Sequence, residues 1–134
     1  MKFMLDHNLP PGLARALNEL SKSEGHEVYP LREKFAEDVK DHAWISALGR
    51  ESEWAVISGD ISIFKVEEAR VAWREAKLTI FFLAPGWAHL TFWIKAAKLV
   101  QMWPTILALA TSQRPGVLYR VRLTGKPEVL SPPG

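Results

Sequence analysis

Short apolar runs alternate along this chain with longer segments of helical periodicity. Five runs have the composition of buried or half-buried strands, and they cover residues 3–5, 27–31, 54–57, 78–83 and 117–123. Between them, apolar residues recur every three or four positions, which predicts helices over residues 10–20, 41–48, 65–76 and 88–111. We expect Gly49 to end the second helix and Pro104 to bend or split the last. Strands that alternate with helices predict an α/β fold: a single Rossmann-like domain whose mainly parallel central sheet has helices on both faces.

The size and composition narrow the class of protein. A chain of 134 residues can bury one full core, so we expect one domain over residues 1–130 and a frayed tail over residues 131–134. The sequence contains no cysteine, which excludes disulfide frameworks, thiolate metal sites and cysteine nucleophiles. Its longest uncharged apolar run, residues 99–110, falls short of the roughly 20 residues that span a bilayer, and the first residues do not resemble a signal peptide. We therefore expect a soluble, cytoplasmic protein that does not enter a membrane.

The charges are unevenly distributed between the two halves of the chain. Residues 1–60 carry 7 Lys and Arg against 11 Asp and Glu, whereas residues 61–134 carry 10 against 4. An acidic half that holds a cation, joined to a basic half that holds an anion, is typical of a metal enzyme that acts on phosphates. The alternative is chance segregation of charge in a small domain.

Three aspartates are the candidate metal ligands. Asp6 and Asp60 each follow a predicted strand, and Asp41 begins a predicted helix. Because ligands of open parallel sheets bind beyond the carboxyl ends of the strands, the three carboxylates are expected in one crevice, where Mg²⁺ or Mn²⁺ would offset their repulsion. Asn8 would assist Asp6 through its amide. The alternative for each aspartate is a helix cap or a turn.

Four motifs of the chain together resemble a known family. They are Leu-Asp-His-Asn-Leu-Pro-Pro from Leu5, Gly-His-Glu-Val from Gly25, Asp-x-x-Trp-Ile from Asp41 and Val-Ile-Ser-Gly-Asp from Val56. Their order and spacing are similar to those of PIN-like domains, which include the ribonuclease toxins of type II toxin–antitoxin pairs.

The resemblance implies both a fold and an activity. It implies a Rossmann-like parallel sheet and a Mg²⁺- or Mn²⁺-dependent endoribonuclease in which Asp6, Asp41 and Asp60 are metal ligands and catalytic residues. Ser58 would support the site through its hydroxyl. An RNA substrate and a cognate antitoxin protein would be the partners, and a homodimer is compatible with the resemblance. The candidates for holding the RNA backbone are Arg114, Arg120 and Arg122.

The chain departs from the family pattern after its fourth predicted strand. The family commonly has a fourth acidic or polar residue there, whereas this chain has Ala84-Pro85-Gly86-Trp87. This leaves two alternatives open: a site with a single metal, or an inactive PIN-like module that binds protein. A phosphoacceptor receiver domain is disfavoured, because it needs a hydroxyl residue at that same position.

All six tryptophans are expected to fill the core. For three of them the alternative is base stacking or partner binding; these are Trp87, Trp93 and Trp103.

Overall fold

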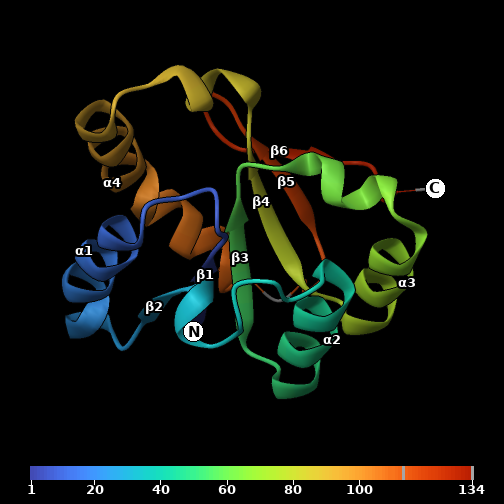
Figure 1. Ribbon diagram of the computed structural model, residues 1–134. Helices are drawn as coiled ribbons and strands as arrows, with labels where there is room; N and C mark the ends of the chain where they lie inside the picture. Colours follow the sequence, from blue (N-terminus) through green and yellow to red (C-terminus); the bar gives the residue numbers. More distant parts are fainter. Residues whose placement is uncertain (113, 134) are drawn as a thin grey trace.

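The computed structural model describes residues 1–112 and 114–133 and contains a sheet of six strands with four α-helices (Figure 1). The strands are β1 (Lys2–Leu5), β2 (Glu27–Pro30), β3 (Trp54–Ser58), β4 (Thr79–Leu83), β5 (Leu118–Val121) and β6 (Glu128–Leu130). The α-helices are α1 (Pro11–Ser21), α2 (Asp41–Glu51), α3 (Glu67–Ala76) and α4 (Phe92–Ala110). Short 3-10 helices occupy η1 (Lys22–Glu24), η2 (Leu31–Glu33), η3 (Ile61–Lys65) and η4 (Pro85–His89).

The sheet has the strand order β2-β1-β3-β4-β5-β6. The first five strands are parallel, and only β6 runs antiparallel to its neighbour β5. This confirms the prediction of a mainly parallel sheet. The sequence pattern missed β6, because three residues with one strongly exposed apolar side chain, Val129, do not establish a period.

Helices cover both faces of the sheet, as predicted. In Figure 1, α1 and α4 lie on one side of the strands and α2 and α3 on the other. The strands supply alternate residues to the two layers: Phe3 and Leu5 of β1 belong to the core beneath α1 and α4, and Met4 belongs to the core beneath α2 and α3. The near-continuous apolar runs in β3 and β4 follow from this double coverage, since every residue of both strands is buried.

Two predicted helix boundaries are wrong. The second helix does not stop at Gly49 but continues to Glu51. The last helix is not split at Pro104; it is one α-helix from Phe92, and the residues just before it form the separate 3-10 helix η4. Part of the predicted tail lies outside the described residues, because Gly134 is not described. Within the described part, Arg74 donates a hydrogen bond of 3.3 Å to the carbonyl of Pro133.

Five of the six tryptophans are buried, and the prediction for Trp93 is wrong. The buried ones are Trp44, Trp54, Trp73, Trp87 and Trp103. The Trp93 side chain is 79% exposed. The buried residues of α4, Leu99, Trp103, Ile106 and Ala110, lie on one side of the helix. At 3.6 residues per turn, Trp93 is rotated by about 110° around the helix axis from the middle of that side. Core packing therefore cannot explain Trp93.

Candidate functional site

Asp6 lies directly after β1 and is the buried carboxylate of the candidate site. Its N–H donates to the carbonyl of Ile57 on β3 at 3.0 Å, so the residue continues the alignment of these two strands. The side chain is only 7% exposed. One carboxylate oxygen accepts a hydrogen bond from the His7 N–H and the other from the Ser58 hydroxyl, both at 2.7 Å. Asp6 is therefore held in one orientation by two neutral donors.

Ser58 joins the ends of β1 and β3. It is fully buried, donates through Oγ to Asp6, and accepts the backbone N–H of Asp60 at 3.1 Å. A second link lies beside it, where the Asn8 side-chain oxygen accepts the N–H of Gly59 at 3.2 Å. The structure thus brings Asn8 and Ser58 to the loops that carry Asp6 and Asp60.

The negative charge of Asp6 is only partly compensated by its surroundings. Burial raises the pKa of the Asp6 carboxyl above its usual range. The hydrogen bonds from Ser58 and His7 oppose that rise, repulsion from the Asp41 carboxylate adds to it, and electrostatic attraction to His7 opposes it. The ion pairs of the described residues all lie elsewhere. A cation near Asp6 and Asp41 would relieve both the desolvation and the repulsion.

Asp41 and Asp60 are engaged with their own elements. Asp41 is the first residue of α2, and its carboxylate accepts a hydrogen bond of 3.0 Å from the Trp44 indole nitrogen. Asp60 is the N-cap of η3 and accepts hydrogen bonds from the backbone N–H, at 3.0 Å, and the hydroxyl of Ser62. In this arrangement no three His, Asp or Glu side chains of residues 1–112 and 114–133 are grouped closely enough to hold a metal ion.

A comparison with protein-family models decides the identity of the fold. The model described as "PIN like domain" matches residues 1–85, more than half of the chain. The chain belongs to the PIN-like domain family. Comparisons with curated proteins and with solved structures give no match. The matched region runs from β1 to the start of η4 and so contains all three aspartates of this PIN-like domain.

The donor chemistry of this PIN-like domain fits a hard divalent cation. Its candidate ligands are carboxylate oxygens, which Mg²⁺ and Mn²⁺ prefer, and the buried Asp6 has no basic side chain in an ion pair with it within the described part of the chain. The Asp41 carboxylate acts on Asp6 through electrostatic repulsion. Asp60 accepts both hydrogen bonds from Ser62 at one carboxylate oxygen, Oδ1, so its second oxygen could still ligate a cation.

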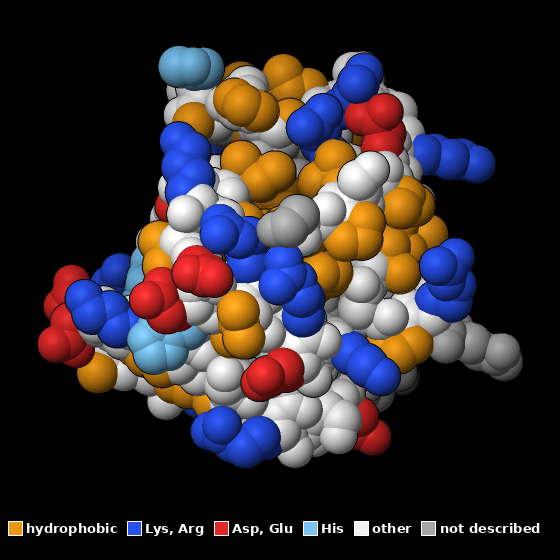
Figure 2. Space-filling model, turned by 90° about the vertical axis from the view of Figure 1, so that its right-hand side faces the viewer, with side chains coloured by type: hydrophobic (Ala, Val, Ile, Leu, Met, Phe, Trp, Pro, Cys, Tyr) orange, Lys and Arg blue, Asp and Glu red, His pale blue; other side chains and the backbone are white. Residues whose placement is uncertain are grey.

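The three candidate arginines of this PIN-like domain are not gathered at one place. Arg114 precedes β5 and Arg122 follows it, so they lie toward opposite ends of that strand. Arg120 lies within β5 and is half-buried, while Arg122 forms an ion pair with Glu128 of β6. On the face in Figure 2, Lys and Arg side chains are scattered among hydrophobic ones rather than collected into one patch.

Sequence reasoning missed Lys95 as a site residue. A small notch of about 130 Å³ adjoins the acid site, and its lining includes Asn8, Gly59 and, from the first turn of α4, Lys95. Lys95 is distant from the aspartates in sequence, so no spacing relates them. One feature of the sequence could have drawn attention to Lys95: it and Lys98 are the only charged residues between Leu90 and Ala110.

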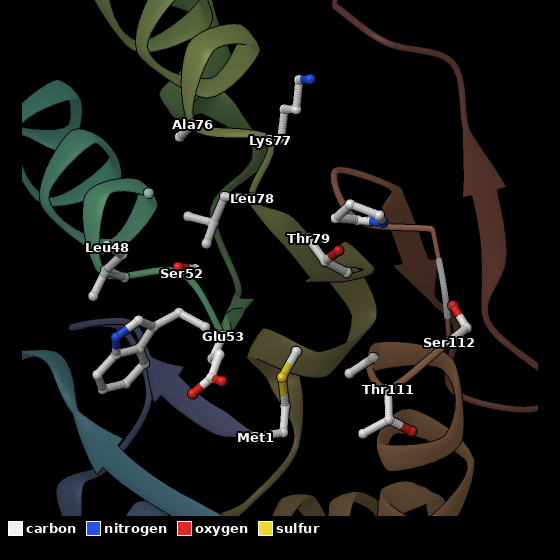
Figure 3. A pocket seen from close by; sticks show the side chains of 14 residues that line it. Met1, Leu48, Ser52, Glu53, Ala76, Lys77, Leu78, Thr79, Thr111 and Ser112 are labelled. Atoms are coloured by element: carbon white, nitrogen blue, oxygen red, sulfur yellow. The ribbon is translucent and has the colours of Figure 1, made fainter.

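A larger cavity of about 530 Å³ lies at the other end of the strands (Figure 3). Residues at the C-terminal ends of three helices contribute to it, including Gly49 of α2, Ala76 of α3 and Ala110 of α4. Glu53 is the one carboxylate in its described lining. This cavity therefore does not contribute to the site around Asp6.

None of the helices in the described part of this PIN-like domain combines the length and the hydropathy needed to cross a lipid bilayer.

Proposed function

We propose that this PIN-like domain is a Mg²⁺- or Mn²⁺-dependent endoribonuclease that hydrolyses RNA phosphodiesters at Asp6, Asp41 and Asp60. The observation that carries the proposal is the buried carboxylate of Asp6 at the carboxyl end of β1, which forms no ion pair with a basic side chain of the described residues. Ligands of open α/β sheets bind at that edge. PIN-like domains are typically nucleases, so the family supports the same reaction class.

The residues of the site would divide the work in the following way. Asp6 and Asp41 would hold the cation, and Asp60 would join them through Oδ2, the oxygen that does not accept from Ser62. When bound, a divalent cation lowers the pKa of its water and offsets the negative charge that develops on the phosphate. Ser58 fixes the Asp6 carboxylate by donating to one of its oxygens, and Asn8 holds the loop between Ser58 and Asp60 in place. Both are positioning residues in this proposal.

The motif resemblance supports a narrower biological role. It favours the toxin of a type II toxin–antitoxin pair, with cellular RNA as substrate and a cognate antitoxin protein as the partner that restrains it. Induction in a bacterial host should then arrest growth, and Asp6→Asn should abolish the arrest at the same expression level. Arrest that persists unchanged in Asp6→Asn would contradict a toxic activity of this site.

The central experiment measures Mn²⁺ affinity by calorimetry and RNA cleavage by gel electrophoresis for the wild type, Asp6→Asn and Asp38→Asn. Asp38 is an exposed acid in the loop before α2 and serves as the matched control. We expect the wild type and Asp38→Asn to bind Mn²⁺ and cut RNA, and Asp6→Asn to lose at least about 100-fold in rate, comparable to removal of one stabilising group in an active site. A wild type that neither binds metal nor cuts RNA would overturn the proposal.

The second candidate is an inactive PIN-like module that binds protein. Two observations favour it: Asp60 is occupied as the cap of η3, and the aromatic Trp93 is exposed. A protein that captures a defined partner yet leaves RNA intact at every metal concentration would favour this candidate over the nuclease.

A further inference from the structure

The exposed side of α4 has the composition of a buried surface. Nine residues of this helix are exposed, and none of them is charged. These nine residues form the α4 face: Phe92, Trp93, Ile94, Ala97, Val100, Gln101, Pro104, Thr105 and Ala108. A surface helix ordinarily carries charged side chains on the side that meets water. A long face without any charge therefore indicates that another surface covers it.

The two charged residues of α4 lie off this face. Lys95 and Lys98 are both half-buried, and Lys98 donates to the carbonyl of Leu123 at 3.3 Å. At 3.6 residues per turn, the centre of the α4 face lies about 90° around the helix axis from Lys98 and about 150° from Lys95. The face is therefore neutral, and it offers no counter-charge to a strongly acidic or strongly basic partner.

Large and small side chains are segregated along the α4 face. The largest, Trp93, is 79% exposed and lies in the first turn of the helix. Small side chains lie beyond the middle of the helix, at Pro104, Thr105 and Ala108. Along the helix axis, Trp93 precedes Gln101 by about 12 Å and Ala108 follows Gln101 by about 10 Å. Two copies packed antiparallel about Gln101 therefore place each Trp93 over the small residues of the other copy.

Gln101 favours a second copy of this chain over a lipid surface as the occupant. Its amide is both a donor and an acceptor, so two copies related by a two-fold axis at Gln101 can pair amide with amide. In the acyl region of a membrane the same amide would have no partner, which costs free energy. A neutral face also lets two identical copies meet without placing like charges opposite each other.

We propose that the α4 face is the interface of a homodimer in which two copies pack their α4 helices antiparallel about a two-fold axis at Gln101. A shallow crossing angle of about 20°, one of the common classes of helix packing, keeps Trp93 within reach of Ala108 of the other copy. One helix from each copy makes a small interface, so we expect a dissociation constant on the order of 10 µM. This inference does not depend on the proposed nuclease function.

The first test measures self-association of the full chain by analytical ultracentrifugation, without RNA or metal. Trp93→Glu and Ala108→Glu each place a charge at one end of the α4 face. Val129→Glu changes a side chain of similar exposure, 70%, on β6 and is the matched control. All three positions are exposed, so circular dichroism should show that every variant is folded.

We expect the wild type to change from monomer to dimer as its concentration rises. Trp93→Glu and Ala108→Glu should each weaken the dimer at least about 10-fold, as expected when a central aromatic contact of an interface is lost. Val129→Glu should dimerise like the wild type. Equal losses in Trp93→Glu and Ala108→Glu follow from the antiparallel arrangement, because the two positions then contact each other.

The second test uses single cysteines to fix the orientation of the two helices, since the chain has no cysteine of its own. Gln101→Cys should form a disulfide-linked dimer under mild oxidation, because a residue at a two-fold axis meets its own copy. Ile94→Cys should not, because the two copies of Ile94 would lie about 21 Å apart in the antiparallel dimer. Non-reducing electrophoresis separates the cross-linked from the free chain.

Three results would overturn the inference. The first is a folded wild type that stays monomeric at every concentration, and binding of that monomer to lipid vesicles would then assign the α4 face to a membrane surface. The second is self-association that neither Trp93→Glu nor Ala108→Glu weakens, which would place the interface elsewhere. The third is cross-linking of Ile94→Cys as efficient as that of Gln101→Cys, which would show a parallel arrangement of the helices.

Discussion

At the residue scale, the three aspartates of the site are not equivalent. Asp6 is buried between two neutral donors, whereas Asp60 caps a 3-10 helix and Asp41 accepts a hydrogen bond from an indole. Burial and the repulsion of Asp41 raise the pKa of Asp6, so the folded state binds that proton more tightly than the unfolded state does. Ionised Asp6 therefore opposes folding at any pH above its raised pKa. Functional sites commonly retain such destabilising groups.

We expect Asp6→Asn to stabilise the fold at neutral pH while it removes activity. The amide has no charge to desolvate, and its oxygen and nitrogen can still pair with the His7 N–H and the Ser58 oxygen. The free energy of unfolding at pH 7 should rise by on the order of 0.5 kcal/mol or more, the usual scale of a stabilising substitution. Urea titrations measure the difference between variant and wild type.

The pH dependence of the free energy of unfolding checks why Asp6→Asn is more stable than the wild type. The advantage of Asp6→Asn should shrink as the pH falls through the raised pKa of Asp6, and it should vanish below about 3.9, the value in an unfolded chain. Asp38→Asn, which removes an exposed carboxylate, should show no such trend. A destabilised Asp6→Asn at pH 7 would mean that the charged form contributes to folding after all.

At the scale of elements, the packing of α2 against α3 depends on a glycine. Gly49 lies inside α2, and a Cβ built on it would stand 2.4 Å from the Cβ and 2.8 Å from the Cα of Ala76 on α3. The sequence suggested a helix stop at this position, but the residue is needed for close approach of two helices. Of these two helices, α2 begins at Asp41, and both line the large cavity with residues near their C-terminal ends.

Gly49→Ala should destabilise the protein by about 1–3 kcal/mol, because the added methyl group forces the two helices apart. Gly12→Ala is the matched control: Gly12 lies in α1, where a new Cβ meets nothing within 4 Å. The free energy of unfolding of Gly12→Ala should rise by up to about 1 kcal/mol, because alanine lowers the backbone entropy of the unfolded state. Thermal unfolding of both variants gives the comparison, and equal effects would show that close approach at Gly49 is unimportant.

At the scale of the whole molecule, loops from distant parts of the chain meet at one edge of the sheet. The strands that lead to Asp6 and Asp60 are followed by loops at the same edge as η4, which precedes Lys95. A cation bound there would attach to the folded state only, because the unfolded chain does not bring the carboxylates together.

Mn²⁺ should therefore raise the melting temperature of the wild type. At a Mn²⁺ concentration ten times its dissociation constant, the free energy of unfolding should rise by about 1.4 kcal/mol. This corresponds to a rise in melting temperature of roughly 3–6 °C for a domain of this size. Asp6→Asn should show no shift, and EDTA should reverse the shift in the wild type. Differential scanning fluorimetry at matched ionic strength measures both, and an equal shift in Asp6→Asn would place any bound metal elsewhere.

Much of this architecture could be predicted from local patterns. The buried runs of β1, β3 and β4 and the helical spacing of α1, α2 and α3 follow from burial on one or both faces, which the sequence records directly. The short strand β6 and the exposure of Trp93 could not be predicted in this way. Both depend on which surfaces the rest of the chain happens to cover.

The sequence by itself determined the α/β class, the mainly parallel sheet and the positions of Asp6 and Asp60 after their strands, because each depends on hydrophobic periodicity along the chain. Only the tertiary structure decided that Ser58 donates to Asp6, that Asn8 accepts from Gly59, and that Lys95 reaches the notch beside Asn8. The residues brought together in this way are as many as 87 positions apart, from Asn8 to Lys95, which line the same notch. Local spacing carries no information about such contacts, since they form only when parallel strands bring their carboxyl ends to one edge.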